Sequence, residues 1–335
     1  MKNALDLNSA VIIDNLNKRN FLLGCFFGSI VGDALGAPVE FKPRKWLMRN
    51  PVKDMDLKNH NFKDLVLEPG SWTDDTSLTL CLAKSLIEKG FDETDQLEKY
   101  ISWWKNGYLS VNDVCFDIGN TTKRALQKFY NSKYSKNKIK ITDESNSQSE
   151  WDVAYGNGSL MRLSVIPIYI YQNNGSLLDC IQMCAKSSAT THDSVLCQDA
   201  CKILGGIIWL ILHKTKKNDL FKELQKVLNK KNIHPDLHDI IDQTFLLKEN
   251  IHVKSTGYVL DSLECALYCF FKCENYNDSV LMAVNMGNDT DTNACICGTM
   301  SGAYYGFNDI NVKWINTLQK PELLWDTIKL LLRKS

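Results

Sequence analysis

The sequence predicts an all-α protein built as one large domain. Apolar residues recur at helical spacing along nearly the whole chain, and no series of segments alternates between apolar and polar residues as strands would. No repeat period is visible. The 335 residues, 44% of them hydrophobic, are enough to bury a substantial core. We therefore expect about a dozen helices packed around a single core.

The individual helices are expected where apolar residues repeat every three or four positions. In chain order they span Phe21–Leu35, Ser77–Lys89, Asp95–Lys105, Asn120–Tyr130, Ser176–Ser187, Ser194–His213, Leu220–Leu228, Leu237–Leu247, Ser262–Cys273, Asp278–Met286, Asp289–Tyr305 and Pro321–Arg333.

Two segments are expected to lie outside the helical packing. Residues 1–20 form a polar N-terminal extension, and the domain itself occupies residues 21–335. The stretch 131–150 is rich in Ser, Asn and Lys and is predicted to be a flexible surface insertion, because chemistry-bearing motifs lie on both sides of it.

Composition excludes several classes of protein. Lys+Arg 39 balances Asp+Glu 39, so no overall basic field favours nucleic acid. The twelve cysteines stand at helical spacing without C-x-x-C pairs, which indicates reduced thiols rather than disulfides or structural zinc. The N-terminus does not resemble a signal peptide. The apolar run from Phe21 to Val31 is too short to span a bilayer. A soluble, cytoplasmic protein without membrane association is expected.

Two predicted helices carry a stripe of small residues at every fourth position. One stripe is Gly24, Gly28, Gly32 and Gly36, and the other is Ala294, Gly298, Gly302 and Gly306. Glycine inside a helix costs roughly 1 kcal/mol relative to alanine, so the stripes need a compensating gain. Close packing of helix backbones supplies it.

Two acidic clusters stand at predicted helix starts. Thr73-Asp74-Asp75-Thr76 precedes one helix, and Asp289-Thr290-Asp291-Thr292 begins another. Helix capping explains one such side chain, but each start carries two carboxylates and two threonines with no basic neighbour. Carboxylates gathered in a dry site repel one another, and a divalent cation removes that repulsion. Oxygen ligands favour Mg²⁺, Mn²⁺ or Ca²⁺, and four acids suffice for two ions if the clusters meet in space.

At these residues the chain resembles the ADP-ribosylglycohydrolase family, particularly its bacterial branch with the dinitrogenase reductase-activating glycohydrolase. Six segments match in the family's order: Gly28–Phe41 (GSIVGDALGAPVEF), Trp72–Ser77 (WTDDTS), Asp117–Thr121 (DIGNT), Gly156–Arg162 (GNGSLMR), Ser188–His192 (SATTH) and Asn288–Asn293 (NDTDTN). The sequence departs from the pattern at Asn288, where many relatives have glycine, and at Asp193, where the bacterial enzyme has glycine.

The resemblance implies an all-α fold with a central cleft holding two Mg²⁺ or Mn²⁺ ions. The metal ligands implied by the matching positions are Thr73, Asp74, Asp75, Asp289, Asp291 and Thr292. The implied catalytic acids are Glu40, Asp75 and Asp117, which the sequence does not rank for proton transfer, although Glu40 is favoured for positioning water or substrate. The implied ADP-ribose pocket is lined by Asp117, Gly119, Asn120, Thr121, Gly156, Asn157, Gly158, Ser159, Met161 and His192.

Three neighbouring side chains allow more than one interpretation. The glycine-rich loop before Ser159 could bring backbone amides to a diphosphate at a helix start, although such turns are common. Arg162 could pair with phosphate or with a structural acid. Trp72 is expected to pack in the core rather than to stack on adenine.

The expected reaction is hydrolysis of the bond between ribose C1″ and a modified protein side chain, most simply arginine, with serine as the alternative. The expected partners are an ADP-ribosylated protein as substrate and ADP-ribose as product. Two other functions stay open. One is an immunity-type protein that blocks an ADP-ribosyltransferase toxin, with residues 1–20 as a plug. The other is a Mg²⁺-dependent phosphoesterase, because paired metals also suit phosphoryl transfer.

Overall fold

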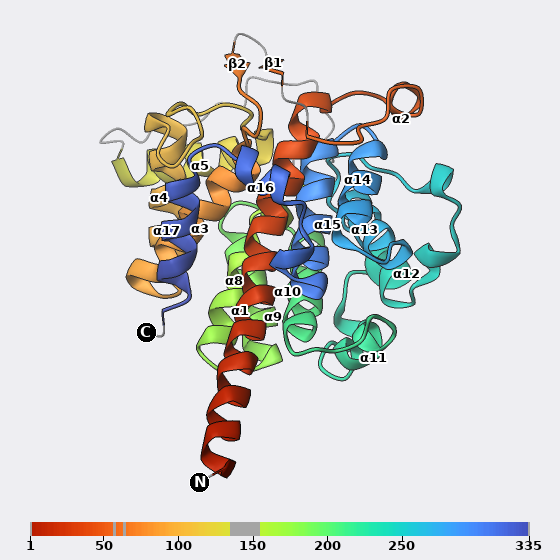
Figure 1. Ribbon diagram of the computed structural model, residues 1–335. Coiled ribbons are helices and arrows are strands. Elements are labelled where there is room, and N and C mark those ends of the chain that lie inside the picture. The colour runs from red at the N-terminus through yellow and green to blue at the C-terminus, as the bar shows by residue number, and fades with distance from the viewer. Residues whose placement is uncertain (1, 56–57, 63–64, 135–154, 334–335) are drawn as a thin grey trace.

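The computed structural model describes residues 2–55, 58–62, 65–134 and 155–333, with side chains from Lys18 onward. Helices make up most of it, as the apolar periodicity predicted (Figure 1). Their bounds are α1 Lys2–Gly36, α2 Arg44–Leu47, α3 Asp74–Lys89, α4 Glu93–Asn106, α5 Asn120–Tyr134, α7 Gly158–Met161, α8 Val165–Gln172, α9 Leu177–Ala189, α10 Val195–Leu212, α11 Leu220–Gln225, α12 His238–Ile241, α13 Val259–Lys272, α14 Tyr276–Asn285, α15 Thr290–Tyr305, α16 Val312–Thr317 and α17 Pro321–Leu331.

Helices α1 and α15 form the centre of the fold, and their stripes of small residues meet as predicted. A methyl group on Gly24, Gly28 or Gly32 would overlap backbone atoms of Gly302, Gly298 and Ala294 respectively. The two helices are therefore antiparallel and in backbone contact. This packing brings the C-terminal end of α1 against the N-terminal end of α15, so that the Thr290 hydroxyl donates to the Gly36 carbonyl at 2.8 Å.

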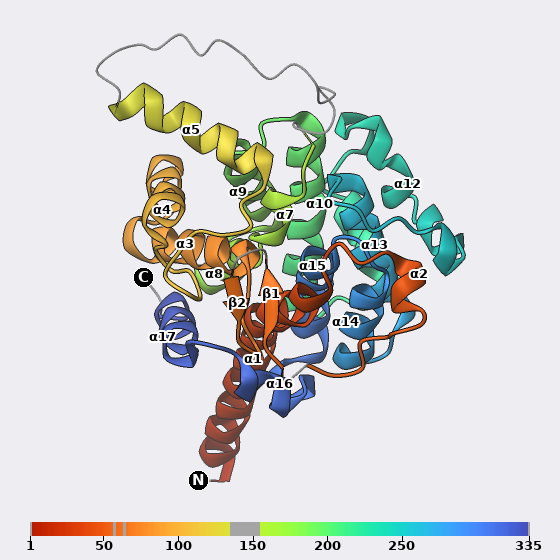
Figure 2. The same ribbon diagram turned by 90° about the horizontal axis from the view of Figure 1, so that it is seen from above.

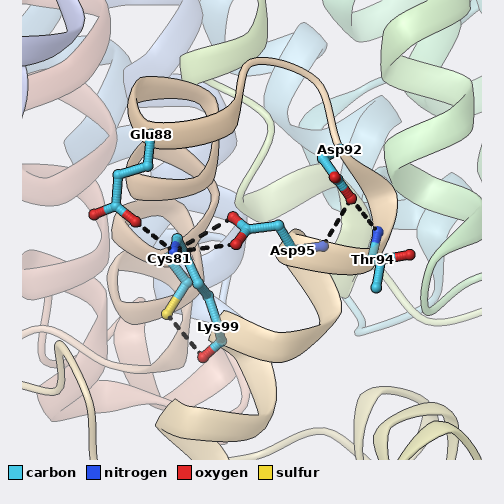
Figure 3. Close-up of polar contacts among 6 residues, drawn as sticks. All are labelled: Cys81, Glu88, Asp92, Thr94, Asp95 and Lys99. Carbon is cyan, nitrogen blue, oxygen red and sulfur yellow. Dashed lines mark hydrogen bonds and ion pairs between the residues drawn. The ribbon is translucent and has the colours of Figure 1, made fainter. Parts of the chain in front are cut away.

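Helix α3 is held from its outer side by α4. Lys99 of α4 lies between Glu88 of α3, at 2.7 Å, and Asp95, at 3.3 Å (Figure 3). The Cys81 thiol of α3 donates to the Lys99 carbonyl at 3.6 Å. Asp92 caps α4 by accepting from the amides of Thr94 and Asp95. These contacts keep α3 in register with α4, with the start of α3 turned toward α1 and α15.

Two apolar helices lie in the core. The segments Lys18–Val39 and Val195–Leu212 are long and apolar enough to cross a membrane. The first apolar segment is therefore longer than the run Phe21–Val31 that the sequence analysis considered too short to span a bilayer. Within them 83% and 78% of the hydrophobic window is buried against the rest of the protein, as in the core helices of a globular domain. All twelve cysteines are free thiols, and ten of them are buried, which confirms the prediction of reduced apolar packing.

The structure corrects several expected boundaries. Helix α1 begins at Lys2 rather than Phe21, so residues 2–20 continue the first helix away from the body of the fold (Figure 1). The expected helix Leu237–Leu247 is broken, because Gln243 adopts a left-handed conformation with φ 61° and separates α12 from a 3₁₀ turn, Thr244–Leu247. Of the predicted insertion 131–150, the residues up to Tyr134 belong to α5, and the rest lies outside the described residues.

Several elements were not predicted, including the short helices α2 and α16. Helix α8, Val165–Gln172, is buried on nearly all sides and so lacks the one-sided pattern by which a helix is recognised. A small antiparallel hairpin pairs β1, His60–Phe62, with β2, Leu65–Leu67, and these are the only paired strands in the described parts of the chain. Three residues per strand are too few to show an alternation in the sequence.

Candidate functional site

The start of α3 carries the first acidic cluster. Thr73 is the N-cap residue, and its hydroxyl accepts from the Asp75 amide. Asp74 and Asp75 therefore fall in the first turn, where the partial positive charge of a helix N-terminus favours carboxylates. Both are buried, at 6% and 1% exposure, although carboxylates at a helix start usually face water.

The start of α15 carries the second cluster, and the two clusters meet. The Thr292 hydroxyl donates to Asp75 Oδ1 at 3.2 Å, and the Thr73 hydroxyl lies 3.4 Å from Asp291 Oδ2. Residues more than two hundred positions apart in the sequence thus share hydrogen bonds. This confirms the assumption on which the sequence-based metal hypothesis depended.

A buried carboxylate that the sequence analysis did not single out supports this junction. Asp33 of α1 is fully buried and accepts hydrogen bonds from the backbone amides and the hydroxyls of both Thr73 and Thr76, at 2.6–3.1 Å. Burial raises the pKa of Asp33 to about 6, although these hydrogen bonds lower it. Asp33 therefore fixes the first turn of α3 to α1.

The two clusters open into a cavity of about 650 Å³, a size that suits a small-molecule ligand. Six carboxylates line it, and no lysine or arginine is found in its described lining. The six are Glu40, Asp74, Asp75, Asp117, Asp289 and Asp291. Figure 2 looks down on the ends of α1, α3 and α15 that build this part of the molecule.

Glu40 joins the second cluster through a paired turn. The Phe41 amide donates to the Asn288 carbonyl at 2.7 Å, and the Asn288 amide donates to the Lys42 carbonyl at 2.8 Å. Both Phe41 and Asn288 adopt left-handed conformations, with φ 63° and 59°. The pairing places carboxylate oxygens of Glu40, Asp289 and Asp291 within 4.8 Å of one another, an arrangement that could hold a metal ion.

The electrostatics of the cluster are unfavourable without a cation. Burial, followed by repulsion from neighbouring carboxylates, raises the pKa of Glu40, Asp74, Asp75 and Asp291 well above the usual range. In addition, Glu40 Oε2, Asp75 Oδ2 and Asp291 Oδ1 are buried and accept no hydrogen bond from the described residues. Buried carboxylate oxygens without donors are costly and therefore indicate a missing positive partner.

His192 lines the same cavity as a neutral imidazole. Burial lowers its pKa to about 3, and the nearby Arg162 guanidinium lowers it further. The Thr191 hydroxyl accepts from Arg162 at 2.7 Å and lies 2.8 Å from His192 Nδ1. A hydroxyl that accepts from Arg162 still has its own proton to donate to Nδ1, and in that arrangement the ring proton is on Nε2, toward Gly156 and Gly158.

Part of the glycine-rich loop is paired within the protein itself. The Asn157 amide donates to the Gly257 carbonyl and is not available to a diphosphate. A side chain on Gly156 or Gly158 would contact His192, so these glycines make room for that ring. Helix α7, which follows, has only one turn.

Three residues near the predicted pocket contact other parts of the protein and do not line the cavity. Ser159 lies outside the cavity, because its buried hydroxyl accepts from Ser188 at 2.9 Å and from the Cys201 thiol. Arg162 is fully buried and pairs with no acid among the described residues; it donates to the carbonyls of Gly158 and Ser187 and to Thr191. Trp72 is completely buried and packs in the core, as expected.

The remaining predicted residues come together at the cavity, except that Thr73 lies just behind its wall. The lining contains Glu40, Asp74, Asp75, Asp117, Gly119, Asn120, Thr121, Gly156, Asn157, Gly158, Met161, His192, Asp289, Asp291 and Thr292. It also contains residues for which the sequence analysis predicted no role there: Phe41, Ile118, Thr122, Thr256, Gly257 and Asn288. Thr256 and Gly257 belong to no matching segment, so no signal in this single sequence indicated them.

Comparison with known proteins agrees with this geometry. The family model described as ADP-ribosylglycohydrolase matches residues 14–335. The chain belongs to the ADP-ribosylglycohydrolase family. Among its relatives, ADP-ribosylarginine hydrolase Tri1 of Serratia proteamaculans is 32% identical over 300 residues, covering 89% of this chain and 75% of the relative.

Other members of the family match over similar lengths. ADP-ribosyl-[dinitrogen reductase] glycohydrolase of Rhodospirillum rubrum is 27% identical over 297 residues, covering 88% of this chain and 89% of the relative. A solved structure titled ADP-ribosylglycohydrolase-related protein complex superposes with a TM-score of 0.74 at 29% identity, covering 95% of this chain and 99% of that chain. The all-α fold expected from the resemblance is therefore confirmed.

Proposed function

We propose that this member of the ADP-ribosylglycohydrolase family hydrolyses ADP-ribosylarginine with the help of two divalent cations, Mg²⁺ or Mn²⁺. The observation that carries the proposal is the convergence of Glu40, the α3 acids and the α15 acids on one cavity, with three buried carboxylate oxygens that accept no hydrogen bond from the described residues. The donors are all oxygen, which suits hard cations.

The proposed ligands are Thr73, Asp74, Asp75, Asp289, Asp291 and Thr292. We add Glu40 to this group, because its carboxylate oxygen lies within 4.8 Å of those of Asp289 and Asp291. When bound, two such ions would neutralise the carboxylates, hold the ribose hydroxyls and make water a better nucleophile near neutral pH. The rest of the mechanism depends on the side chains of the chain itself.

The carboxylates of the cavity favour a cationic substrate. ADP-ribosylarginine carries a guanidinium, and its ribose gains positive charge as the bond to C1″ breaks. Asp117, which lines the cavity with Asp74, is proposed to contact the substrate. His192 is proposed to donate from Nε2 to an oxygen of ADP-ribose. The names of two relatives, 32% and 30% identical, specify ADP-ribosylarginine as their substrate, which supports the choice of arginine over serine.

In the proposed step, a water oxygen forms a bond to C1″ and the bond between C1″ and the guanidino nitrogen breaks. The nitrogen keeps the electron pair and gains the proton that the water loses, so the products are ADP-ribose and unmodified arginine. We propose Glu40, Asp75 and Asp117, which all line the cavity, as the acids that carry this proton. We assign the positioning of the water to Glu40, because its buried Oε2 accepts no hydrogen bond from the described residues.

The proposal is tested by incubating the protein with arginine-linked and serine-linked ADP-ribosylated peptides, with and without Mg²⁺ or Mn²⁺. Mass spectrometry should show release of intact ADP-ribose from the arginine-linked peptide, and only with metal. Release of AMP or phosphate would instead identify a phosphoesterase. Equal turnover in the presence of a chelator would contradict the metal proposal.

Metal binding is expected to stabilise the protein more at pH 8 than at pH 5. The pKa values of Asp74, Asp75 and Asp291 are raised in the folded protein. The stability that these acids contribute to the metal-free fold is therefore fully present below about pH 4, where they are protonated, and is lost as the pH rises through their folded pKa values. For Asp33 the loss falls between about pH 4 and 6. Thermal melting with and without Mn²⁺ at both pH values measures the difference. An equal shift at both would argue against cation binding by these acids.

ADP-ribose is expected to raise the melting temperature only when Mg²⁺ or Mn²⁺ is also present. The described lining of the cavity contains six carboxylates and no lysine or arginine, so a diphosphate would be repelled from the metal-free site. The measurement is thermal melting at neutral pH in four samples: without additions, with metal, with ADP-ribose, and with both. A shift with ADP-ribose alone would contradict this account of the cavity.

Asp33→Asn is expected to weaken Mn²⁺ binding by about 10- to 100-fold, because the start of α3 loses its anchor. Its amide group would face the Thr76 backbone amide, donor against donor, at an expected cost of about 2 kcal/mol in stability. Calorimetric titration measures the affinity. Asp199→Asn is the matched control: that carboxylate is equally buried, but it binds Lys202 and the His234 amide instead. Asp199→Asn should lower the stability of the protein and leave its affinity for Mn²⁺ unchanged.

A role in immunity is compatible with this activity and rests on a different part of the chain. Residues 1–20 were proposed as a plug for a transferase toxin, and side chains before Lys18 lie outside the described residues. Deleting residues 1–17 separates the two functions, since loss of protection against a toxin with hydrolysis intact would assign blocking to this segment. A cytoplasmic location is part of the proposal.

A further inference from the structure

A second groove, of about 360 Å³, lies directly beside the catalytic cavity. Thr256 and Asn288 line both of them. The outer wall of the groove is formed by α2 and the residue after it, Met48, and the inner wall by the loop 250–256. In Figure 2, α2 lies at the outer side of α13 and α14, away from the body of α1. Anything that leaves the catalytic cavity on this side must cross the groove.

The groove is held in shape by one arginine. Arg44 donates from Nε to the Met286 carbonyl at 2.8 Å and from its terminal nitrogens to the carbonyls of Asn250, at 2.7 Å, and Val253, at 2.5 Å. Leu47 is fully buried and anchors α2 from below. The groove is therefore formed before any partner arrives, which lowers the cost of binding.

Large apolar side chains stand exposed on and around this groove. Phe41 is 70% exposed, Met48 71% and Ile251 66%. Trp46, 41% exposed, lies beside them under the Lys42 ammonium group. A cluster of exposed apolar groups next to a cavity mouth is typical of an interaction surface.

The charge of the same surface is opposite to that of the cavity. Lys42, Lys45 and Lys254 are exposed, and none of the three has an ion-pair partner among the described residues. The described lining of the groove includes Lys45 and Lys254 but no carboxylate. Glu249 precedes the loop, Asp261 accepts from the Thr256 hydroxyl at 2.6 Å and Asp289 follows Asn288, but none of these acids is part of the described lining.

We propose that this surface docks the protein part of the substrate, and specifically an acidic and partly apolar segment that flanks the modified arginine. The proposal rests on the proposed function, because it assumes that the catalytic cavity holds the ADP-ribosylarginine itself. The surface then adds recognition of the polypeptide, with lysines attracting its carboxylates and Met48 and Ile251 contacting its apolar groups.

Two synthetic peptides test the proposal, each with one ADP-ribosylated arginine. One has aspartate, glutamate and leucine around the arginine, and the other has lysine in place of the acids. The acidic peptide is expected to have a kcat/KM about tenfold higher, mainly through faster association. The difference should shrink in 0.5 M salt, where charge interactions are screened. Free ADP-ribosylarginine serves as the substrate that does not reach the groove.

Charge reversal identifies the surface. In Lys45→Glu/Lys254→Glu the preference for the acidic peptide should disappear or invert, while kcat/KM for free ADP-ribosylarginine stays the same. Met48→Ser should lower kcat/KM for the acidic peptide about fivefold through lost apolar contact. The control Lys222→Glu/Lys231→Glu changes the same charge on two exposed lysines that line neither the cavity nor the groove, and should leave the preference intact.

Three results would overturn the proposal. The first is a wild-type chain that does not distinguish the two peptides, and the second is a preference that survives the charge reversal. The third is binding to phosphatidylserine vesicles that charge reversal abolishes, together with equal use of both peptides, which would assign the surface to a membrane. Failure to cleave free ADP-ribosylarginine would instead contradict the proposed function. Because this substrate does not reach the groove, that result is distinguishable from failure of the docking proposal.

Discussion

Asp291→Asn is expected to lower kcat by about a thousandfold while the protein stays folded. Asp291 is one of three acids whose oxygens could share a cation, and it also faces the Thr73 hydroxyl. Losing its charge should remove about 4 kcal/mol of electrostatic stabilisation from the transition state, which corresponds to that factor in rate. Release of ADP-ribose from an arginine-linked peptide under saturating Mn²⁺ measures the effect.

The thermal stability of metal-free Asp291→Asn should not fall together with its activity. Burial and the neighbouring Asp289 raise the pKa of Asp291, so its charge is unfavourable in the metal-free fold. The metal-free variant should therefore melt no lower than the wild type, and its stabilisation by Mn²⁺ should be smaller. Asp326→Asn makes the same chemical change at an acid with a 71% exposed side chain on α17 and should alter neither property. Unchanged kcat in Asp291→Asn would falsify the assignment of this residue to the metal site.

Gly302→Ala is expected to destabilise the protein by about 3 kcal/mol. In most helices this change is favourable by about 1 kcal/mol, because alanine has the higher helix propensity. Here the added methyl group would overlap the Gly24 backbone, which cannot rotate away as a side chain can. The two helices would have to separate. Denaturant unfolding monitored by circular dichroism measures the free energy.

The comparison for this prediction is Gly119→Ala. A methyl group there meets nothing within 4 Å, so the same substitution should leave the free energy of unfolding nearly unchanged. Because Gly119 lines the cavity, it serves as a control for stability only. Equal or greater stability of Gly302→Ala relative to the wild type would show that α1 and α15 can adjust their spacing without cost.

The sequence was informative wherever local chemistry and tertiary position coincide. Asp74 follows the capping residue Thr73, and Asp291 lies in the first turn of α15. Both their helix position and the unusual density of charge around them are visible in the sequence. The antiparallel packing of α1 on α15 was indicated in the same way, because the stripe at Gly28 has no purpose in an isolated helix. The meeting of the two acidic clusters follows once those stripes are in contact.

Other features depend on contacts that no short segment contains. Asp33 follows an apolar run inside a helix, and only the folded structure shows that its four donors come from Thr73 and Thr76. The glycine-rich segment before Ser159 is typical of a phosphate-binding turn, yet the Ser159 hydroxyl accepts a hydrogen bond from Ser188 of the neighbouring helix α9. The groove beside α2 is formed by Arg44 bonds to a loop about two hundred residues away.

The backbone contact between α1 and α15 also sets the order in which a working molecule can appear during synthesis. Gly36 and Thr290, which touch in the finished fold, are 254 residues apart. At the usual speed of translation, the first helix therefore waits on the order of ten seconds or more for its partner. During that time its apolar faces, including Phe26 and Ile30, lack the neighbours that later cover them. A nascent chain at this stage is a natural client for chaperones and has no assembled acidic site.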